Sequence, residues 1–142
     1  MAAKDIIDLL ILIVALAAFI LSLFELHSYK LKETNKLLSQ LNKRYLESND
    51  LQTVVKYLRE IDPDDTEPSA YQVELFLRFF EELNVYLRHG NLKPDDVKTF
   101  FNFYFDRLYH SERGQKLLKK IYHEDRTLKY LDGYKEKIGF KD

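Results

Sequence analysis

The feature that most limits how this chain can fold is a run of sixteen uncharged residues, Leu9 to Phe24. Ser22 is the only polar residue in the run. Sixteen helical residues extend about 24 Å, and the longer stretch 6–26 extends about 31 Å, the thickness of a bilayer's hydrocarbon core. A core helix of a soluble protein would show a polar face, which this run lacks. We therefore predict a transmembrane helix over residues 6–26.

A buried core helix and a cleaved secretion signal are the two alternative interpretations of the run. A secretion signal begins with positive charge and ends in a small-x-small cleavage site. Here Lys4 is offset by Asp5 and Asp8, and the segment SLFELHSYK after the run lacks the cleavage pattern. The run is therefore interpreted as an uncleaved anchor.

Basic residues gather after the run, at Lys30, Lys32, Lys36, Lys43 and Arg44, whereas only Lys4 precedes it. The positive-inside rule places the N-terminus outside and the C-terminal domain in the cytoplasm. Lys30, Lys32 and Lys36 are also candidates for contact with anionic lipid headgroups. A solvated helix face explains the same lysines without lipid.

Residues with small side chains lie on one side of the predicted span. Ala15, Ala18 and Ser22 follow helical spacing, and the last two form a small-xxx-small pair. Such faces let membrane helices approach closely, so these residues are candidates for helix packing. A single helix without a partner is the alternative.

The rest of the chain has the spacing of helices and no credible strand. We expect a basic membrane-proximal helix over 27–47 and a cytoplasmic bundle over 48–142. The low counts of glycine (4) and proline (3) agree with helical structure. The predicted class is all-α, with one N-terminal transmembrane helix and a cytoplasmic bundle of about four or five helices.

Capping residues predict where the bundle helices begin: Asn49 or Asp50, Ser69, Pro94 and Ser111, with short helical turns over 127–138. The first of these helices is expected to include Ile61 in its apolar face. The acidic segment DPDDTEP (62–68) lacks the spacing of an EF-hand loop. It is predicted to be a solvated turn.

The helix that begins after Ser69 has more apolar surface than a surface helix needs. Beside its core stripe, Leu75, Phe79 and Tyr86 form a second stripe, which fits either a central position in the bundle or burial against another subunit. On the next helix, Phe100 is assigned to the core and Phe103 projects away from it. Together these features favour self-association, with Leu75, Phe79, Tyr86 and Phe103 as candidate interface residues.

The sequence contains little that indicates catalysis. It has no cysteine, no phosphate-binding glycine loop and no histidine spacing typical of a metal site, so we expect no enzyme activity, metal or cofactor. Arg107 and His110 are weak catalytic candidates. Helical nucleases of the HEPN type use an Arg and a His separated by four to six residues, whereas two residues separate this pair. The end of an amphipathic helix is the simpler interpretation.

The stretch VELFLRFFEELNVYLRHGNLKPDDVKTFFNFYF (73–105) resembles the central pattern of a broad bacterial family of membrane-anchored helical proteins. Size and layout are also similar to those of the single-span accessory proteins of type VI-B, RNA-targeting CRISPR systems, which carry a divergent HEPN-like bundle. The second resemblance implies a homo-oligomeric pore in the bacterial inner membrane that supports antiviral defence by depolarising it. It implies a CRISPR nuclease complex or RNA as a further partner, and a ring of helices with Asp8 at its outer mouth.

Two other functions remain open from the residues alone. One is a membrane-tethered adaptor or sensor, whose bundle binds a protein or a small signalling ligand through its aromatic surface. The other is a membrane-bound RNase, for which Arg107 and His110 are the only motivation.

Overall fold

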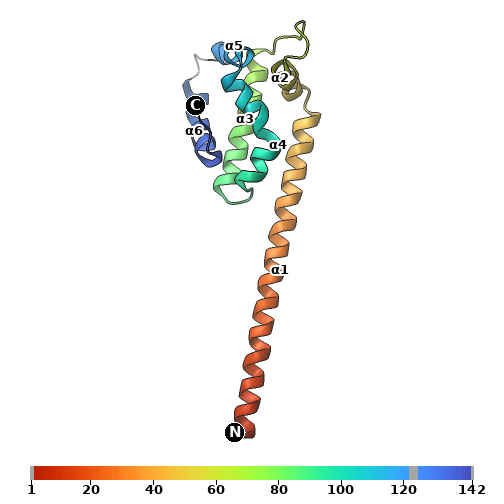
Figure 1. The fold of residues 1–142 in the computed structure, drawn as a ribbon, viewed down its shortest axis with the longest axis vertical. Coiled ribbons are helices and arrows are strands. Elements are labelled where there is room, and N and C mark those ends of the chain that lie inside the picture. The colour runs from red at the N-terminus through yellow and green to blue at the C-terminus, as the bar shows by residue number, and fades with distance from the viewer. Residues whose placement is uncertain (1, 122–124, 142) are drawn as a thin grey trace. The chain divides into compact units, whose positions relative to one another are not determined.

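The computed structural model describes residues 2–121 and 125–141, and these residues form six α-helices and no strand (Figure 1). The helices are α1 (Ala3–Glu47), α2 (Asn49–Arg59), α3 (Ala70–Arg88), α4 (Pro94–His110), α5 (Glu112–Ile121) and α6 (Asp125–Ile138). The predicted all-α class, with one long apolar N-terminal helix and a bundle, is confirmed. The chain divides into two compact units, Met1–Lys36 and Leu37–Asp142.

The first unit consists of the N-terminal part of α1. Its residues 2–33 are all exposed. None of the residues in the most apolar 18-residue window of this helix is buried. In the described part of the chain, α1 is therefore the one helix long and apolar enough to cross a membrane.

The second unit is the helical bundle, and it includes the last turns of α1. Leu38, Leu41 and Tyr45 are buried in its core. The bundle therefore begins at residue 37 and not at residue 48, because these three side chains supply part of its apolar surface.

Helix α3 is the central helix of the bundle. It packs against α2, α5 and α6, and its Phe79 and Phe80 rings contact the Phe101 and Phe105 rings of α4. Seven of its residues are buried: Val73, Phe76, Leu77, Phe79, Phe80, Leu83 and Leu87. The wide apolar arc seen in the sequence is thus used mainly inside the bundle.

Aromatic rings fill the centre of the core. The Phe80 ring lies 5.0 Å from Phe76, 4.8 Å from Phe105 and 5.4 Å from Tyr134, measured between ring centroids. All four side chains are fully buried. Edge-to-face and tilted pairs at these distances add about 0.5–1.5 kcal/mol each to the burial of apolar area.

The start of α2 differs from its prediction by one residue. The Ser48 hydroxyl accepts a hydrogen bond from the Leu51 amide, so Ser48 is the N-cap. The helix ends at Arg59 because Glu60 adopts a left-handed conformation with φ 58°. Ile61 therefore lies outside α2 and is 80% exposed, contrary to prediction.

The other predicted helix starts are confirmed. Ser69 and Gln72 form a capping box at α3, and Pro94 occupies the first turn of α4. The Ser111 hydroxyl accepts a hydrogen bond from the Gly114 amide at α5. The C-terminal residues form the continuous helix α6 and not separate short turns, since Leu131, Tyr134 and Ile138 share a buried face.

Gly114 allows α5 to approach the end of α4. A Cβ atom there would lie 2.3 Å from the Leu108 carbonyl oxygen and 2.4 Å from that of Arg107. Backbone carbonyl groups within a helix cannot move aside as a flexible side chain can. We therefore expect Gly114→Ala to lower the free energy of unfolding by about 1–3 kcal/mol. The measurement is the thermal midpoint of the full-length protein in mild detergent.

Gly133→Ala is the matched control, since the nearest atom to its added Cβ is the end of the flexible Asn84 side chain. Alanine also favours a helix interior over glycine by roughly 0.5–1 kcal/mol. An equal loss of stability in both variants would contradict the assigned role of Gly114.

Candidate functional site

The predicted packing face of the span is exposed in the first unit. Asp8, Ala15, Ala18 and Ser22 are all exposed. The Ser22 hydroxyl donates a hydrogen bond of 2.9 Å to the Ala18 carbonyl, one turn earlier in the same helix. The lysines proposed to meet lipid, Lys30, Lys32 and Lys36, are exposed as well.

The four residues of the predicted oligomer interface differ in how far they are buried. Phe79 is only 4% exposed, because its ring packs 5.1 Å from Tyr45 and 5.4 Å from Phe101 within the bundle. Leu75 and Tyr86 are half-buried against the same core. The assignment of Phe79 to an exposed interface is therefore wrong, since the last turns of α1 cover it.

Phe103 and Phe100 remain on the surface, with 64% and 48% of their area exposed. The prediction that Phe100 belongs to the core is wrong, and Phe105 is buried instead. We call Phe100 and Phe103 the α4 aromatic patch. Tyr104 and Arg107 border it, with the Arg107 guanidinium 5.9 Å from the Phe103 ring.

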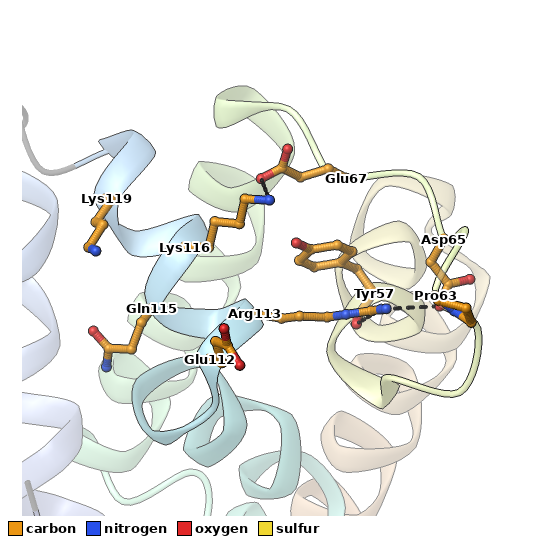
Figure 2. Close-up of a pocket in the computed structure, with 9 residues that line it drawn as sticks. All are labelled: Tyr57, Pro63, Asp65, Glu67, Glu112, Arg113, Gln115, Lys116 and Lys119. Atoms are coloured by element: carbon orange, nitrogen blue, oxygen red, sulfur yellow. Dashed lines mark hydrogen bonds and ion pairs between the residues drawn. The ribbon is translucent and has the colours of Figure 1, made fainter.

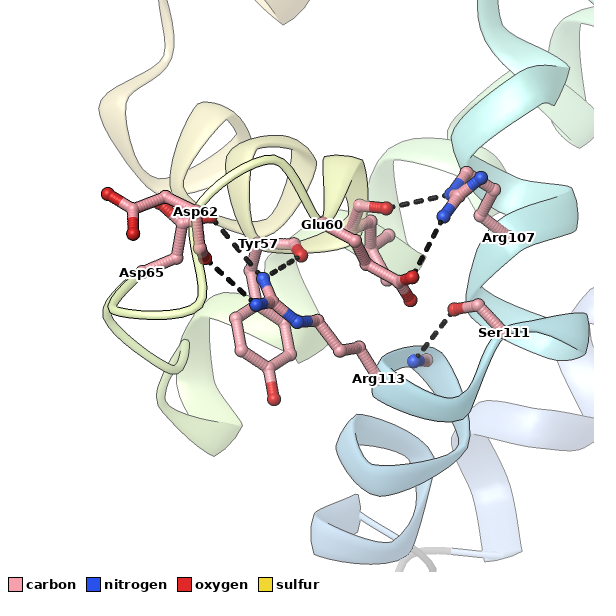
Figure 3. A network of polar contacts seen from close by, with 9 residues as sticks. Tyr57, Glu60, Asp62, Asp65, Arg107, Ser111 and Arg113 are labelled. Carbon is pink, nitrogen blue, oxygen red and sulfur yellow. Dashed lines mark hydrogen bonds and ion pairs between the residues drawn. The ribbon is translucent and has the colours of Figure 1, made fainter.

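Arg107 and His110 are engaged by different partners. Arg107 Nε donates a hydrogen bond of 2.7 Å to the Leu58 carbonyl, and its guanidinium lies 3.4 Å from the Glu60 carboxylate (Figure 3). His110 Nδ1 lies 3.1 Å from Asp106 Oδ1, and the imidazole stacks on Phe140. Arg107 thus caps the C-terminus of α2, where a helix leaves carbonyls unpaired. These contacts give Arg107 a structural role at this helix end.

Arg113 secures the same end of α2 and the loop that follows it. Its guanidinium donates to the carbonyl oxygens of Tyr57 and Asp62, both at 2.9 Å, and lies 3.3 Å from Asp65 Oδ2 (Figure 3). It also lies 4.8 Å from the centre of the Tyr57 ring. Helix-end carbonyls carry partial negative charge, so a guanidinium is favoured there.

The acidic segment is therefore not simply a solvated turn. The Asp65 side chain is only 5% exposed. Glu67 forms an ion pair of 3.2 Å with Lys120, whose ammonium also donates to the Pro68 carbonyl. The sequence showed acids in one segment and bases about fifty residues later, but periodicity does not indicate that they meet.

A hollow of about 740 Å³ lies beside this network, between α5 and the segment that follows α2 (Figure 2). Its charged lining is balanced between acids and bases, namely Asp65, Glu67, Glu112, Arg113, Lys116 and Lys119. Its described lining residues include no histidine or serine. Among the described residues, no group of side chains is arranged to hold a metal ion. The hollow therefore presents a polar surface on which acidic and basic side chains are balanced.

Two buried phenols lie in the bundle core. Burial raises the pKa of the Tyr134 hydroxyl well above its usual value, and this hydroxyl donates to the Asn102 side chain. Burial also raises the pKa of Tyr45, and Tyr104 adds to the effect. The Tyr45 hydroxyl has no hydrogen-bond partner among the described residues. Both groups are uncharged at neutral pH and act as core side chains.

Removing the Arg113 guanidinium should destabilise the bundle. We expect Arg113→Met to lower the free energy of unfolding by about 1–3 kcal/mol, because it leaves a buried carboxylate and two carbonyls without their donor. Urea unfolding of the full-length protein followed by near-UV circular dichroism measures this. Lys116→Met is the control, since Lys116 is exposed and 3.9 Å from Glu67, and pairs of that kind contribute little. An equal loss of unfolding free energy in both variants would contradict the assigned role of Arg113 at the end of α2.

Comparison with known proteins finds no matching family model, no similar curated protein and no similar solved structure.

Proposed function

We propose that this chain is a homo-oligomeric, single-span membrane protein of the bacterial inner membrane and acts as a pore-like or membrane-perturbing effector. The observation that supports the proposal is the exposed, uncharged run from Leu9 to Phe24. Burying one large apolar side chain away from water is worth about 1.5–3 kcal/mol, so lipid is the favoured environment of this run. The basic residues that follow it favour a cytoplasmic bundle.

The proposed mechanism depends on several copies of α1 packing side by side. Small side chains at Ala15, Ala18 and Ser22 would allow close approach of the helices. A narrow passage lined by apolar side chains stays closed when water leaves it and opens when the helices separate slightly. Asp8 would then place negative charge at the outer mouth.

The resemblance to accessory proteins of RNA-targeting CRISPR systems suggests the biological setting. In that setting the protein would depolarise the membrane during antiviral defence, with a CRISPR nuclease complex or RNA as its trigger. A potential-sensitive dye in expressing cells tests this. An unchanged potential after activation of the nuclease would count against the antiviral role.

The first test of the general proposal is the mass of the full-length protein in mild detergent, after subtraction of bound detergent. We expect a discrete assembly of six or more subunits, and ion conductance when it is added to planar bilayers. A monomer or dimer without conductance would reject the pore.

A second candidate is a membrane-tethered adaptor, and the α4 aromatic patch favours it. Phe100 and Phe103 are exposed side by side on one helix, and such apolar surface is typical of partner-binding sites. Here the span serves only as an anchor. A monomer in detergent, combined with loss of a bound partner in Phe103→Ala, would support the adaptor.

A further inference from the structure

Most of the polar and small residues of the membrane helix share one heptad spacing. Steps of four and three residues connect Lys4, Asp8, Ile11, Ala15, Ala18, Ser22, Glu25 and Tyr29. We call these eight residues the polar seam. Of the polar residues and alanines from Asp8 to Glu25, only Ala17 lies outside it. A seven-residue repeat is the spacing of helices that pack with a left-handed crossing.

We propose that the polar seam is the contact face between parallel copies of this chain, packed with a left-handed crossing. This inference rests on the proposed homo-oligomer and specifies which face of the helix forms it. Copies that insert by the same flanking charges share one orientation, so the helices are parallel.

The depth of the charged residues supports this assignment. The uncharged run is about 24 Å long, whereas the hydrocarbon core is about 30 Å thick. Asp8 and Glu25, which bound the run, therefore lie at or within the edges of the hydrocarbon. Both belong to the polar seam, so one helix contact removes both carboxylates from lipid.

Charge complementarity favours a second copy as the occupant. Lys4 precedes Asp8 by one helical turn on the same seam, about 6 Å along the axis. In parallel copies the Lys4 ammonium of one helix reaches the Asp8 carboxylate of its neighbour. At the other edge, the Tyr29 hydroxyl stands one turn from Glu25 and can donate to it across the contact.

The hydrogen bond of Ser22 makes it compatible with close packing. Its hydroxyl donates to the Ala18 carbonyl at 2.9 Å within the same helix, so it needs no acceptor from lipid or from a partner. Ser22 therefore packs as a small side chain, like Ala15 and Ala18.

The bundle does not use the heptad positions of the seam. The α1 residues buried in the bundle core are Leu38, Leu41 and Tyr45, which fall at other heptad positions. The seam positions continue at Ser39, Lys43 and Leu46, and all three are exposed. Folding of the bundle thus leaves these positions free of its core.

Disulfide cross-linking tests the proposal directly, because the chain has no native cysteine. Single cysteines are placed at residues 11, 15, 18 and 22 of the seam and at residues 13, 17 and 20 outside it, in the full-length protein in native membranes. After oxidation we expect strong dimer bands for the seam positions and weak ones for the others. Ala17→Cys is the matched control for Ala18→Cys, since it has the same parent residue at nearly the same depth.

A bulky substitution provides a second readout. Ala18→Ile should weaken association about tenfold, equivalent to ~1.4 kcal/mol, whereas Ala17→Ile should leave the mass in detergent unchanged. Strongest cross-linking at 13, 17 and 20, or equal cross-linking at all positions of an intact oligomer, would overturn the seam alone. A monomeric protein without cross-links would overturn both the seam and the homo-oligomer.

Discussion

Replacing Leu16 and Ile20 by arginine should release the protein from the membrane. On an insertion scale, each arginine near the centre of a span costs about 2.5–3.5 kcal/mol, so the pair costs about 5–7 kcal/mol. That is comparable to the whole apolar contribution of the run, in which each Leu or Ile contributes roughly 0.3–0.6 kcal/mol. Neither residue belongs to the polar seam, so the effect reports on insertion and not on helix packing.

The measurement is the fraction of protein that stays with the membrane pellet after an alkaline wash. The matched control replaces two exposed apolar residues outside the span, Leu46 and Ile61, by arginine. We expect the control to stay in the pellet and the span variant to move to the supernatant. If the parent protein itself washes off, the helix is not a membrane span, and every proposal based on insertion fails.

Replacing Phe80 by alanine should cause the largest loss of stability in the bundle. Its ring is fully buried and lies within 5.6 Å of four other rings, those of Phe76, Phe79, Phe105 and Tyr134. Removing a buried Phe side chain costs about 3–5 kcal/mol. Since a domain of this kind is stable by roughly 5–15 kcal/mol, the variant should be close to unfolding at 37 °C.

Urea unfolding of the full-length protein in mild detergent, followed by near-UV circular dichroism of its tyrosines, measures the effect. Phe103→Ala is the control, because Phe103 is exposed and its removal should change stability by less than about 0.5 kcal/mol. A similar midpoint for both variants would contradict the position of Phe80 at the centre of the core. A large loss from Phe103→Ala alone would instead show that its ring is covered in the assembled protein.

Local signals in the sequence were sufficient to predict the positions of the helices and most of their ends. The uncharged run, the capping box of Ser69 with Gln72 and the N-terminal proline of α4 act through neighbouring residues, and the structure places helices accordingly. Where the prediction erred, at Ile61, the cause was equally local. Glu60 adopts a left-handed backbone conformation, and nothing in the apolar spacing indicates that a non-glycine residue will do so.

Only the tertiary structure decided what covers each face. Phe79 and Phe103 both stand outside their helix's main core stripe, yet the end of α1 covers Phe79, whereas Phe103 remains 64% exposed. Likewise, Asp65 and Glu67 of segment 62–68 form ion pairs with Arg113 and Lys120, which lie about fifty residues later in the sequence. Periodicity shows which side chains share a face of one helix. The partner of that face depends on how distant helices pack, and a one-dimensional pattern does not contain that information.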